Sequence, residues 1–176
     1  KKVSRERGEG TIPVYAGDIG CYGLGYRPPL ISKDISISMG SSFGLANGLA
    51  RVLDVPIIAH MGDSTFFHSG ISPMINLVYN KARVTMVILD NSTTSMTGFQ
   101  PNPGSGTTAM GEVSSKIRPE EIALACGIEF VEVVDTFDTE KAIDTLERAM
   151  RFDGPSFVVL KRTCAVLEQK EKKNRA

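Results

Sequence analysis

Apolar and polar positions along this chain follow two alternating patterns. Short runs rich in β-branched and aliphatic residues are separated by longer stretches that are compatible with amphipathic helices. This order is typical of an α/β domain built on a mostly parallel, doubly wound sheet with helices on both faces. Six strands are predicted, at Thr11–Gly17, Ile35–Met39, Pro56–Met61, Val84–Asp90, Glu129–Val134 and Ser156–Lys161.

Four helices are predicted between these strands, and two of them carry end signals. Ser72 before Pro73 is typical of a helix start, because proline is tolerated at the first helical position. Gly127 follows the third helix, where a left-handed residue commonly ends a helix. The predicted helices are Ser41–Leu53, Pro73–Lys81, Pro119–Ala125 and Thr139–Phe152.

Three glycines recur at every fourth residue along the first predicted helix. Gly40, Gly44 and Gly48 leave one face of this helix without side chains. The spacing predicts that another element, either the sheet or a partner, approaches this face closely. Gly40 is also compatible with a helix N-terminus that faces a ligand.

A polar segment rich in Ser, Thr, Gly and Pro runs from Asn91 to Ser115. Irregular segments longer than about 12–15 residues are uncommon in compact domains unless they are functional or disordered, so we expect an active-site loop here. At the other end of the chain, residues 168–176 are mostly charged. They predict a charged tail or linker after a single domain over residues 1–167.

Composition narrows the classes of partner. The chain has 176 residues, of which 41% are hydrophobic, and 20 basic residues balance 20 acidic ones. A domain of this size can bury a substantial core. A net charge of zero argues against nucleic acid or an anionic membrane as the partner, because both require an excess of basic charge. A small anionic ligand remains compatible with it.

Cysteine usage and the chain start set further expectations. The three cysteines, Cys21, Cys126 and Cys164, are odd in number and far apart, which argues against a disulfide framework or a CxxC metal site. We therefore expect a reducing, cytoplasmic setting. No apolar run reaches the ~18–20 residues of a membrane span. Because the chain begins with Lys1, we expect a piece of a longer chain or a processed subunit.

The densest chemical signal lies at the ends of two neighbouring predicted strands. One strand ends in Gly62-Asp63-Ser64-Thr65 and the next ends in Asp90-Asn91. Carboxyl ends of parallel strands lie at one edge of a sheet, where ligands bind. Asp63 and Asn91 each offer an oxygen, which suits Mg²⁺ together with phosphate oxygens and water. Gly62 lets the backbone approach a phosphate.

The same residues carry a family resemblance. Gly62-Asp63-Ser64, a spacer of 25 residues and Asp90-Asn91 resemble the thiamine diphosphate motif GDG, a spacer of about that length, and NN. Ser64 replaces the last Gly of this motif and Asp90 replaces the first Asn.

Longer strings make the resemblance more specific. They are Gly17-Asp-Ile-Gly-Cys21-Tyr22, Pro28-Pro29-Leu30, Met39-Gly40-Ser41, the run from Gly62 to Gly70, Val78-Tyr79-Asn80, and the run from Asp90 to Gly98 followed by Gln100-Pro101. Together they resemble the thiamine-binding domain near the C-terminal end of the alpha subunit of indolepyruvate ferredoxin oxidoreductases, over roughly residues 11–165. The resemblance implies a thiamine diphosphate-binding fold of the diphosphate type.

This resemblance also implies roles for individual residues. Asp63 and Asn91 would be the side-chain ligands of Mg²⁺, and Thr93 would supply a backbone carbonyl. Ser64 and Thr65 would hydrogen-bond the diphosphate. The full set of implied cofactor-binding residues is Gly17, Asp18, Ile19, Gly20, Cys21, Met39, Gly40, Ser41, Gly62, Asp63, Ser64, Thr65, Asn91, Thr93, Thr94, Ser95, Met96, Thr97 and Gly98.

The implied activity is the CoA-dependent oxidative decarboxylation of a 2-oxoacid, such as the arylpyruvate indolepyruvate. In this family the cofactor performs the carbon chemistry and the protein holds it in place. A pyrimidine-binding domain or subunit, a second oxidoreductase subunit and cysteine-bound iron–sulfur clusters complete the machinery, and ferredoxin receives the electrons. We therefore expect a dimer or hetero-oligomer, and these 176 residues alone to be incomplete.

Several single residues have two readings. His68 matches a family position and is a candidate for binding the substrate carboxylate or moving a proton, or for a structural hydrogen bond. His60, inside an apolar strand, is predicted to be a core histidine. Cys21 is compatible with cofactor contact or with a small buried residue. Either Met39 or Met96 is a candidate for holding the cofactor bent, although Met39 also fits the core.

Other functions are also compatible with parts of the sequence. Gly62-Asp63-Ser64 resembles the nucleophile block of GDS-type esterases, but that class requires an Asp-x-x-His pair downstream, and no histidine follows His68. A non-oxidative thiamine diphosphate-dependent 2-oxoacid decarboxylase is a second alternative. A non-catalytic assembly module is the third.

Overall fold

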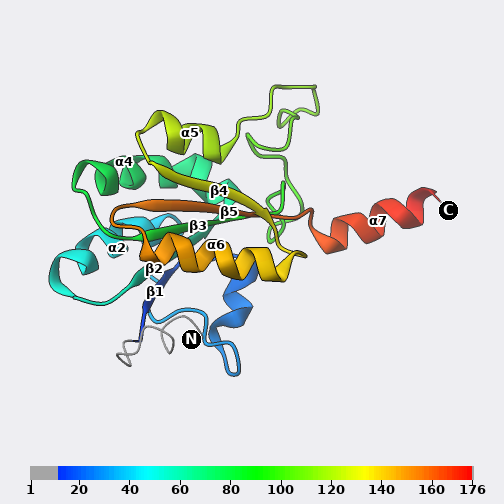
Figure 1. The fold of residues 1–176 in the computed structure, drawn as a ribbon. Helices are drawn as coiled ribbons and strands as arrows, with labels where there is room; N and C mark the ends of the chain where they lie inside the picture. Colours follow the sequence, from blue (N-terminus) through cyan, green and yellow to red (C-terminus); the bar gives the residue numbers. More distant parts are fainter. Residues whose placement is uncertain (1–11, 176) are drawn as a thin grey trace.

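Five strands form one parallel sheet in the order β1-β2-β3-β5-β4 (Figure 1). The structure is a computed structural model and describes residues 12–175. The strands are β1 (Val14–Gly17), β2 (Ile57–Gly62), β3 (Thr85–Asp90), β4 (Phe130–Asp135) and β5 (Ser156–Lys161). The predicted parallel α/β fold is confirmed, with one strand fewer than expected.

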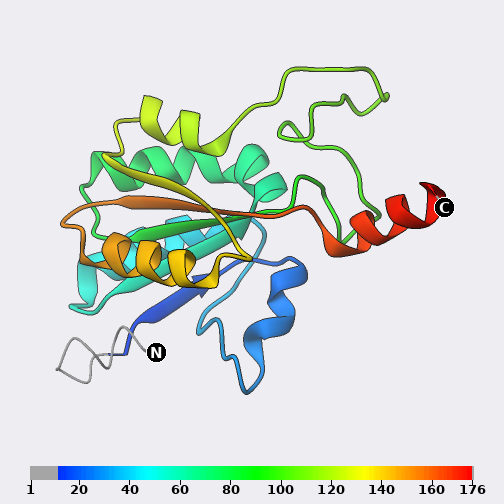
Figure 2. The same ribbon diagram turned by 45° about the vertical axis from the view of Figure 1, so that its right-hand side comes forward.

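Helices cover both faces of the sheet, because each strand is followed by a crossover to the next. Three helices pack on one face: α2 (Ser41–Val52), α4 (Ile71–Tyr79) and α5 (Pro119–Ala125). On the other face α6 (Thr139–Arg151) packs on β3, β4 and β5 (Figure 2). The central strands β3 and β5 are consequently buried on both sides and have nearly continuous apolar sequences.

The main core lies between the sheet and the face that α2, α4 and α5 cover. Phe43 of α2 and Met74 of α4 meet Met61, Met86 and Phe157 of the strands, and all five side chains are fully buried. Every second side chain along β2 and β3 therefore points to this core. The side chains between them point to the other face, towards α6 or the segment that follows β1.

The predicted strand Ile35–Met39 is wrong. Only Ile35 pairs with the sheet, through a single bridge to Ala16 beside β1, and its carbonyl accepts from the Gly17 amide at 2.9 Å. Ile37 and Met39 are exposed, although their alternation with serines is typical of a strand. The segment leaves the sheet edge after one pair because the chain must turn at Gly40 into α2. Of the first predicted strand, Thr11 lies outside the described residues.

The helical run after β2 begins earlier than predicted. A short turn, α3 (Asp63–Thr65), continues into the π-helical segment η2 (Phe66–Gly70) and then into α4. Ser72 and Pro73 lie inside the first turn of α4 and do not cap it. Pro73 is tolerated there because amides of a first helical turn have few partners, and here the hydrogen-bond ladder changes from π to α.

Gly127 ends α5 with a φ of 87°, as predicted. Gly40 has a φ of 85°, and a side chain there would come within 2.2 Å of the Ser69 Oγ. Around Gly44 and Gly48, by contrast, nothing within the described chain lies within 4 Å of an added Cβ. The predicted close approach is therefore present at Gly40 alone within residues 12–175.

The charged segment after β5 is helical. Helix α7 (Ala165–Arg175) extends away from the sheet and begins before the predicted tail at residue 168 (Figure 2). The domain boundary at residue 167 stays a prediction. Among the described residues, no helix combines the length and apolar character needed to cross a bilayer.

Candidate cofactor site at the carboxyl edge of the sheet

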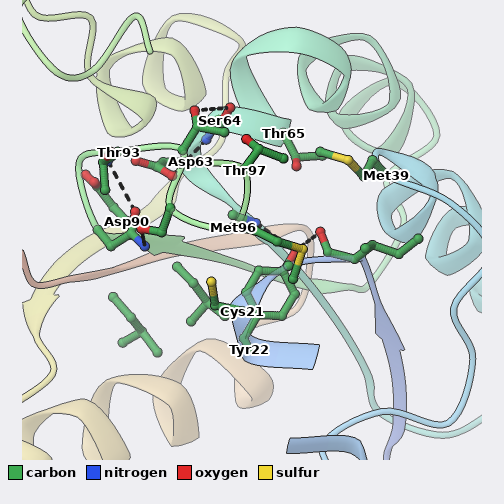
Figure 3. Close-up of a pocket in the computed structure, with 18 of the residues that line it drawn as sticks. Cys21, Tyr22, Met39, Asp63, Ser64, Thr65, Asp90, Thr93, Met96 and Thr97 are labelled. Carbon is green, nitrogen blue, oxygen red and sulfur yellow. Dashed lines mark hydrogen bonds between the residues drawn. The ribbon is translucent and has the colours of Figure 1, made fainter. Parts of the chain in front are cut away.

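The ends of β2 and β3 lie side by side and open into a cavity of about 330 Å³. Their register pairs Gly62 with Leu89, so the polar residues that follow each strand face one another. Figure 3 shows Asp63, Asp90 and Thr93 on one side of this cavity and Met39 on the opposite side. The predicted convergence of the two strand ends is therefore present in the structure.

Most of the residues proposed for cofactor binding line this cavity. They are Ile19, Gly20, Cys21, Met39, Gly62, Asp63, Ser64, Thr65, Asn91, Thr93, Thr94, Ser95, Met96 and Thr97. Five proposed residues are not among its lining residues: Gly17, Asp18, Gly40, Ser41 and Gly98. The candidate catalytic residue His68 is exposed on η2 and is also outside the lining.

Asp18 has a structural role at the start of α2, and the cofactor contact that the resemblance implies for it stays a prediction. Its fully buried carboxylate accepts hydrogen bonds from the backbone amides of Gly40 at 2.8 Å and Ser42 at 2.9 Å. It thereby caps α2 from a distant loop, in place of the usual capping side chain at the helix start. Burial raises the pKa of Asp18, and the two amides oppose that shift. Asp18 thus holds Met39 and its neighbours beside the cavity.

Asp63 is a buried carboxylate without a cationic partner among the described residues. Only 3% of it is exposed. Its Oδ1 accepts from the Ser64 amide at 2.8 Å and its Oδ2 from the Asn102 amide group at 3.0 Å. Burial raises the pKa of Asp63 to about 6, and the neighbouring Asp90 carboxyl adds to the increase. A charge in this environment requires compensation.

Asp90, which replaces the first Asn of the thiamine motif, is compensated. Its Oδ2 lies 3.0 Å from the Nζ of Lys161, the residue that it pairs with across β3 and β5. Its Oδ1 accepts from the Ser92 amide at 2.8 Å. Of the two buried carboxylates at the site, one therefore has a lysine partner and the other has none within the part of the chain described.

The remaining groups fit a hard divalent cation. The Asn91 Oδ1 accepts from the Thr93 amide at 3.2 Å, and this contact holds the Asn91–Thr93 turn together. The Thr93 carbonyl accepts no protein hydrogen bond within residues 12–175. Among those residues, no group of three or more His, Cys, Asp or Glu is arranged to hold a metal ion. One free carboxylate, one amide oxygen and one carbonyl are donors that suit Mg²⁺ and not Zn²⁺.

Tyr22 also lines the cavity, although it was not predicted from the sequence as a site residue. It lies on η1 (Cys21–Tyr26), and its hydroxyl accepts from the Gly62 amide at 3.1 Å. Its ring meets the His60 ring edge-on, with centroids 5.4 Å apart. Burial raises the pKa of Tyr22, so the hydroxyl stays neutral. His60 is buried, as predicted, and supports Tyr22 from below the site.

The structure separates some of the alternative readings. Cys21 is exposed and lines the cavity, so it is not a small buried residue. Met39 and Met96 both line the cavity and both are 56% exposed, so neither is a core residue. Their relative roles stay a prediction.

Five further lining residues were not predicted: Leu89, Asp90, Thr136, Leu160 and Arg162. The last three follow or end β4 and β5, so the strand-end rule that found Asp63 would have found them. Arg162 is held by Asp135 at 3.1 Å and lies over the Phe137 ring at 3.9 Å. It adds a fixed positive charge to one end of the cavity.

Comparisons with known proteins identify the family of this chain. The family described as "Thiamine pyrophosphate enzyme, C-terminal TPP binding domain" matches residues 18–160. Relatives named indolepyruvate oxidoreductase subunit IorA are 50% identical over 167 residues in Archaeoglobus fulgidus and 43% identical over 169 residues in Methanothermobacter marburgensis. These matches cover 95% and 96% of this chain. The chain spans 26% and 27% of those relatives' own length.

Solved structures show the same fold. A 2-oxoglutarate:ferredoxin oxidoreductase from Magnetococcus marinus aligns with a TM-score of 0.81 over 93% of this chain and 58% of its own, at 21% identity. A putative thiamin diphosphate-dependent enzyme from Mycobacterium smegmatis aligns with a TM-score of 0.59 over 85% of this chain and 29% of its own, at 18% identity. The expected thiamine-binding fold is confirmed, as is the resemblance to indolepyruvate oxidoreductases. The chain belongs to the family of C-terminal TPP-binding domains of thiamine pyrophosphate enzymes.

Proposed function

We propose that this chain binds Mg²⁺–thiamine diphosphate and serves as the diphosphate-binding domain of an indolepyruvate-type 2-oxoacid:ferredoxin oxidoreductase. The proposal rests on one observation above all. Asp63 is buried without a cationic partner within residues 12–175, and it lines the same cavity as Asn91 and Thr93. A divalent cation would supply the missing compensation.

The chain's own groups divide into three tasks. Asp63, Asn91 and Thr93 would hold the cation. Gly62, Ser64 and Thr65 would receive the diphosphate, because Gly62 has no side chain to block it and the residues that carry the Ser64 and Thr65 hydroxyls line the cavity. Met39, Met96 and Tyr22 would confine the rest of the cofactor between the two sides shown in Figure 3. When bound, thiamine diphosphate supplies the carbanion chemistry of 2-oxoacid decarboxylation.

Partners would complete the reaction. The relatives are about four times as long as this chain, which leaves room for a pyrimidine-binding domain and for iron–sulfur clusters. We propose that these parts, a second subunit, CoA and ferredoxin act with this domain on an arylpyruvate. His68 stays a candidate for the substrate carboxylate, since it is exposed near the start of α4 and available to a partner domain.

Calorimetric titration of thiamine diphosphate, with and without Mg²⁺, tests the binding proposal. We expect binding only with Mg²⁺, and a loss of at least tenfold in affinity for Asp63→Asn. Asp54→Asn is the matched control, because Asp54 is exposed and distant from the cavity. The proposal fails if the wild-type protein does not bind, or if Asp63→Asn binds like the wild type.

Activity is tested on the protein purified with its subunits. We expect indolepyruvate to reduce ferredoxin in a reaction that requires CoA. Release of an aldehyde without electron transfer would instead identify a non-oxidative decarboxylase.

A further inference from the structure

We propose that Asn102 is a positioning residue for the cation site, and that it couples the order of the loop after β3 to cation binding. This inference rests on the proposed function, because it assigns a residue to the site that would hold Mg²⁺. Asn102 is 39 residues from Asp63 in the sequence, and it lies in the middle of the polar segment Asn91–Ser115.

The contact between these residues is buried on both sides. The Asn102 Nδ2 donates to the Asp63 Oδ2 at 3.0 Å, and the two residues are 4% and 3% exposed. The Ser64 amide donates to the other carboxylate oxygen at 2.8 Å. Each oxygen of Asp63 thus has one protein donor and keeps a lone pair for a cation. The two donors together fix the plane of the carboxylate.

The Asn102 side chain is itself held in one orientation. Its Oδ1 accepts from the Gly104 amide at 2.9 Å, which leaves the Nδ2 for Asp63. The Ser105 amide and hydroxyl both donate to the Asn102 carbonyl, at 2.9 and 2.7 Å. These contacts make residues 102–105 a closed turn that presents an amide donor and no acceptor to Asp63.

This turn also packs on the helical run that carries Asp63. A side chain at Gly104 would lie 3.0 Å from the Phe67 ring, so the turn and η2 are in close contact. Phe67 in turn meets the buried Phe66 ring edge-on, with centroids 5.7 Å apart. The turn therefore contacts the helical run at two points: Gly104 packs on the Phe67 ring, and Asn102 hydrogen-bonds Asp63.

A cation at Asp63 would favour the ionised carboxylate in the orientation that accepts from Asn102, and opening of the loop would remove this donor and leave the carboxylate less well oriented for the cation. Because the coupling is reciprocal, the cation should order the loop and the loop should raise the affinity for the cation. Removing a partner that orients a metal ligand commonly lowers metal affinity by about 10–100-fold.

The test uses the assembled protein and two variants of the same turn. Asn102→Ala removes the donor to Asp63. Ser105→Ala removes the hydroxyl contacts of the turn but leaves both the Asn102 donor and the Ser105 amide bond to the Asn102 carbonyl in place, so it is the matched control. The Mg²⁺ concentration that supports half-maximal thiamine diphosphate binding is measured by calorimetry. Hydrogen–deuterium exchange reports the protection of residues 99–106 with and without Mg²⁺ and thiamine diphosphate.

We expect Asn102→Ala to need at least tenfold more Mg²⁺, while Ser105→Ala stays within threefold of the wild type. Addition of Mg²⁺ and thiamine diphosphate should protect residues 99–106 in the wild type but not in Asn102→Ala. The proposal is overturned if Asn102→Ala stays within threefold, or if Ser105→Ala loses as much affinity as Asn102→Ala. In either case, binding of thiamine diphosphate by the wild-type protein in the presence of Mg²⁺ would still support the proposed function.

If Asn102→Ala does not fold, Asn102→Thr answers the same question. Its hydroxyl is able to accept from the Gly104 amide but is too short to reach Asp63. Asn102→Thr should show the same tenfold loss, and wild-type Mg²⁺ dependence in this variant would refute the role of the Asn102 donor.

Discussion

The hydroxyl of Thr94 donates a 2.9 Å hydrogen bond to the hydroxyl of Ser64, and thereby joins the segment after β3 to the turn after β2. Ser64 is the residue that departs from the last glycine of the thiamine motif. The serine therefore makes a contact that a glycine could not make. This contact connects the part of the cavity wall that follows β2 to the part that follows β3.

This connection predicts coupling between two substitutions. Ser64→Ala and Thr94→Val should each lower the free energy of unfolding by about 0.5–1.5 kcal/mol, since each removes the same hydrogen bond. The double variant should cost less than the sum of the two, by about 0.5–1 kcal/mol. Urea denaturation of the four proteins measures this cycle, and strictly additive effects would mean that the hydroxyls do not interact.

The capping of α2 by the buried Asp18 carboxylate predicts a large stability effect when this side chain is changed. Asp18→Asn retains one acceptor oxygen but sets an amide donor against a backbone amide, so unfolding should become easier by about 1–3 kcal/mol. Asp153→Asn makes the same charge change at an exposed position and should stay within about 0.5 kcal/mol. Equal effects of the two substitutions in thermal and urea denaturation would argue against the cap.

Alanine substitutions at Gly40, which precedes α2, and at Gly44, which lies within it, should change the stability of the protein in opposite directions. Gly40→Ala should destabilise the protein by about 1–3 kcal/mol, because φ is +85° and the new Cβ would clash with Ser69. Gly44→Ala should stabilise it by about 0.5–1 kcal/mol, since this helical position has open space around it. Differential scanning calorimetry measures both changes. Destabilisation by Gly44→Ala would show that an element outside the described residues fills this space.

The burial of the His60 ring predicts that the protein loses stability in mild acid. Burial, followed by the nearby positive charge of Lys33, lowers the pKa of His60 from 6.5 to about 4. The folded protein thus keeps the ring neutral, while the unfolded chain takes up a proton below about pH 6.5. The stability that the neutral ring contributes, about 3 kcal/mol, is present above pH 6.5 and is lost as the pH falls towards 4.

Two histidine variants isolate this effect. Urea denaturation between about pH 7.5 and 4.5 should show a shallower acid decline for His60→Gln than for the wild type. His68→Gln makes the same substitution at an exposed histidine and is the matched control. An unchanged slope for His60→Gln would place the proton uptake at another group.

The strand-end positions of the site could be predicted because they depend on local pattern. Apolar runs located β2 and β3, and the polar residues after each run identified Asp63 and Asn91 as candidate ligands. The prediction of a strand at Ile35–Met39 failed for a related reason. Its alternation is a strand pattern, but pairing depends on whether the chain can follow the sheet edge, and the turn into α2 prevents that.

Long-range contacts could not be predicted in the same way. Asn102 lies in a loop whose local sequence indicates only a turn, and nothing near it in the sequence points to Asp63. Asp18 was assigned to the cofactor by resemblance, yet its partners are amides more than 20 residues away. Both roles depend on how distant loops pack against one another in the folded domain, and local spacing does not carry this information.

The cap on α2 has a consequence for how the site treats negative charge. In many nucleotide-binding folds, the partial positive charge at the amino end of a helix receives a phosphate. Here the protein's own Asp18 already occupies that end of α2. In the proposed site, an incoming diphosphate would therefore depend on a cation and on the short turn after β2. Affinity for the cofactor should consequently be governed by the supply of the metal far more than by the fold itself.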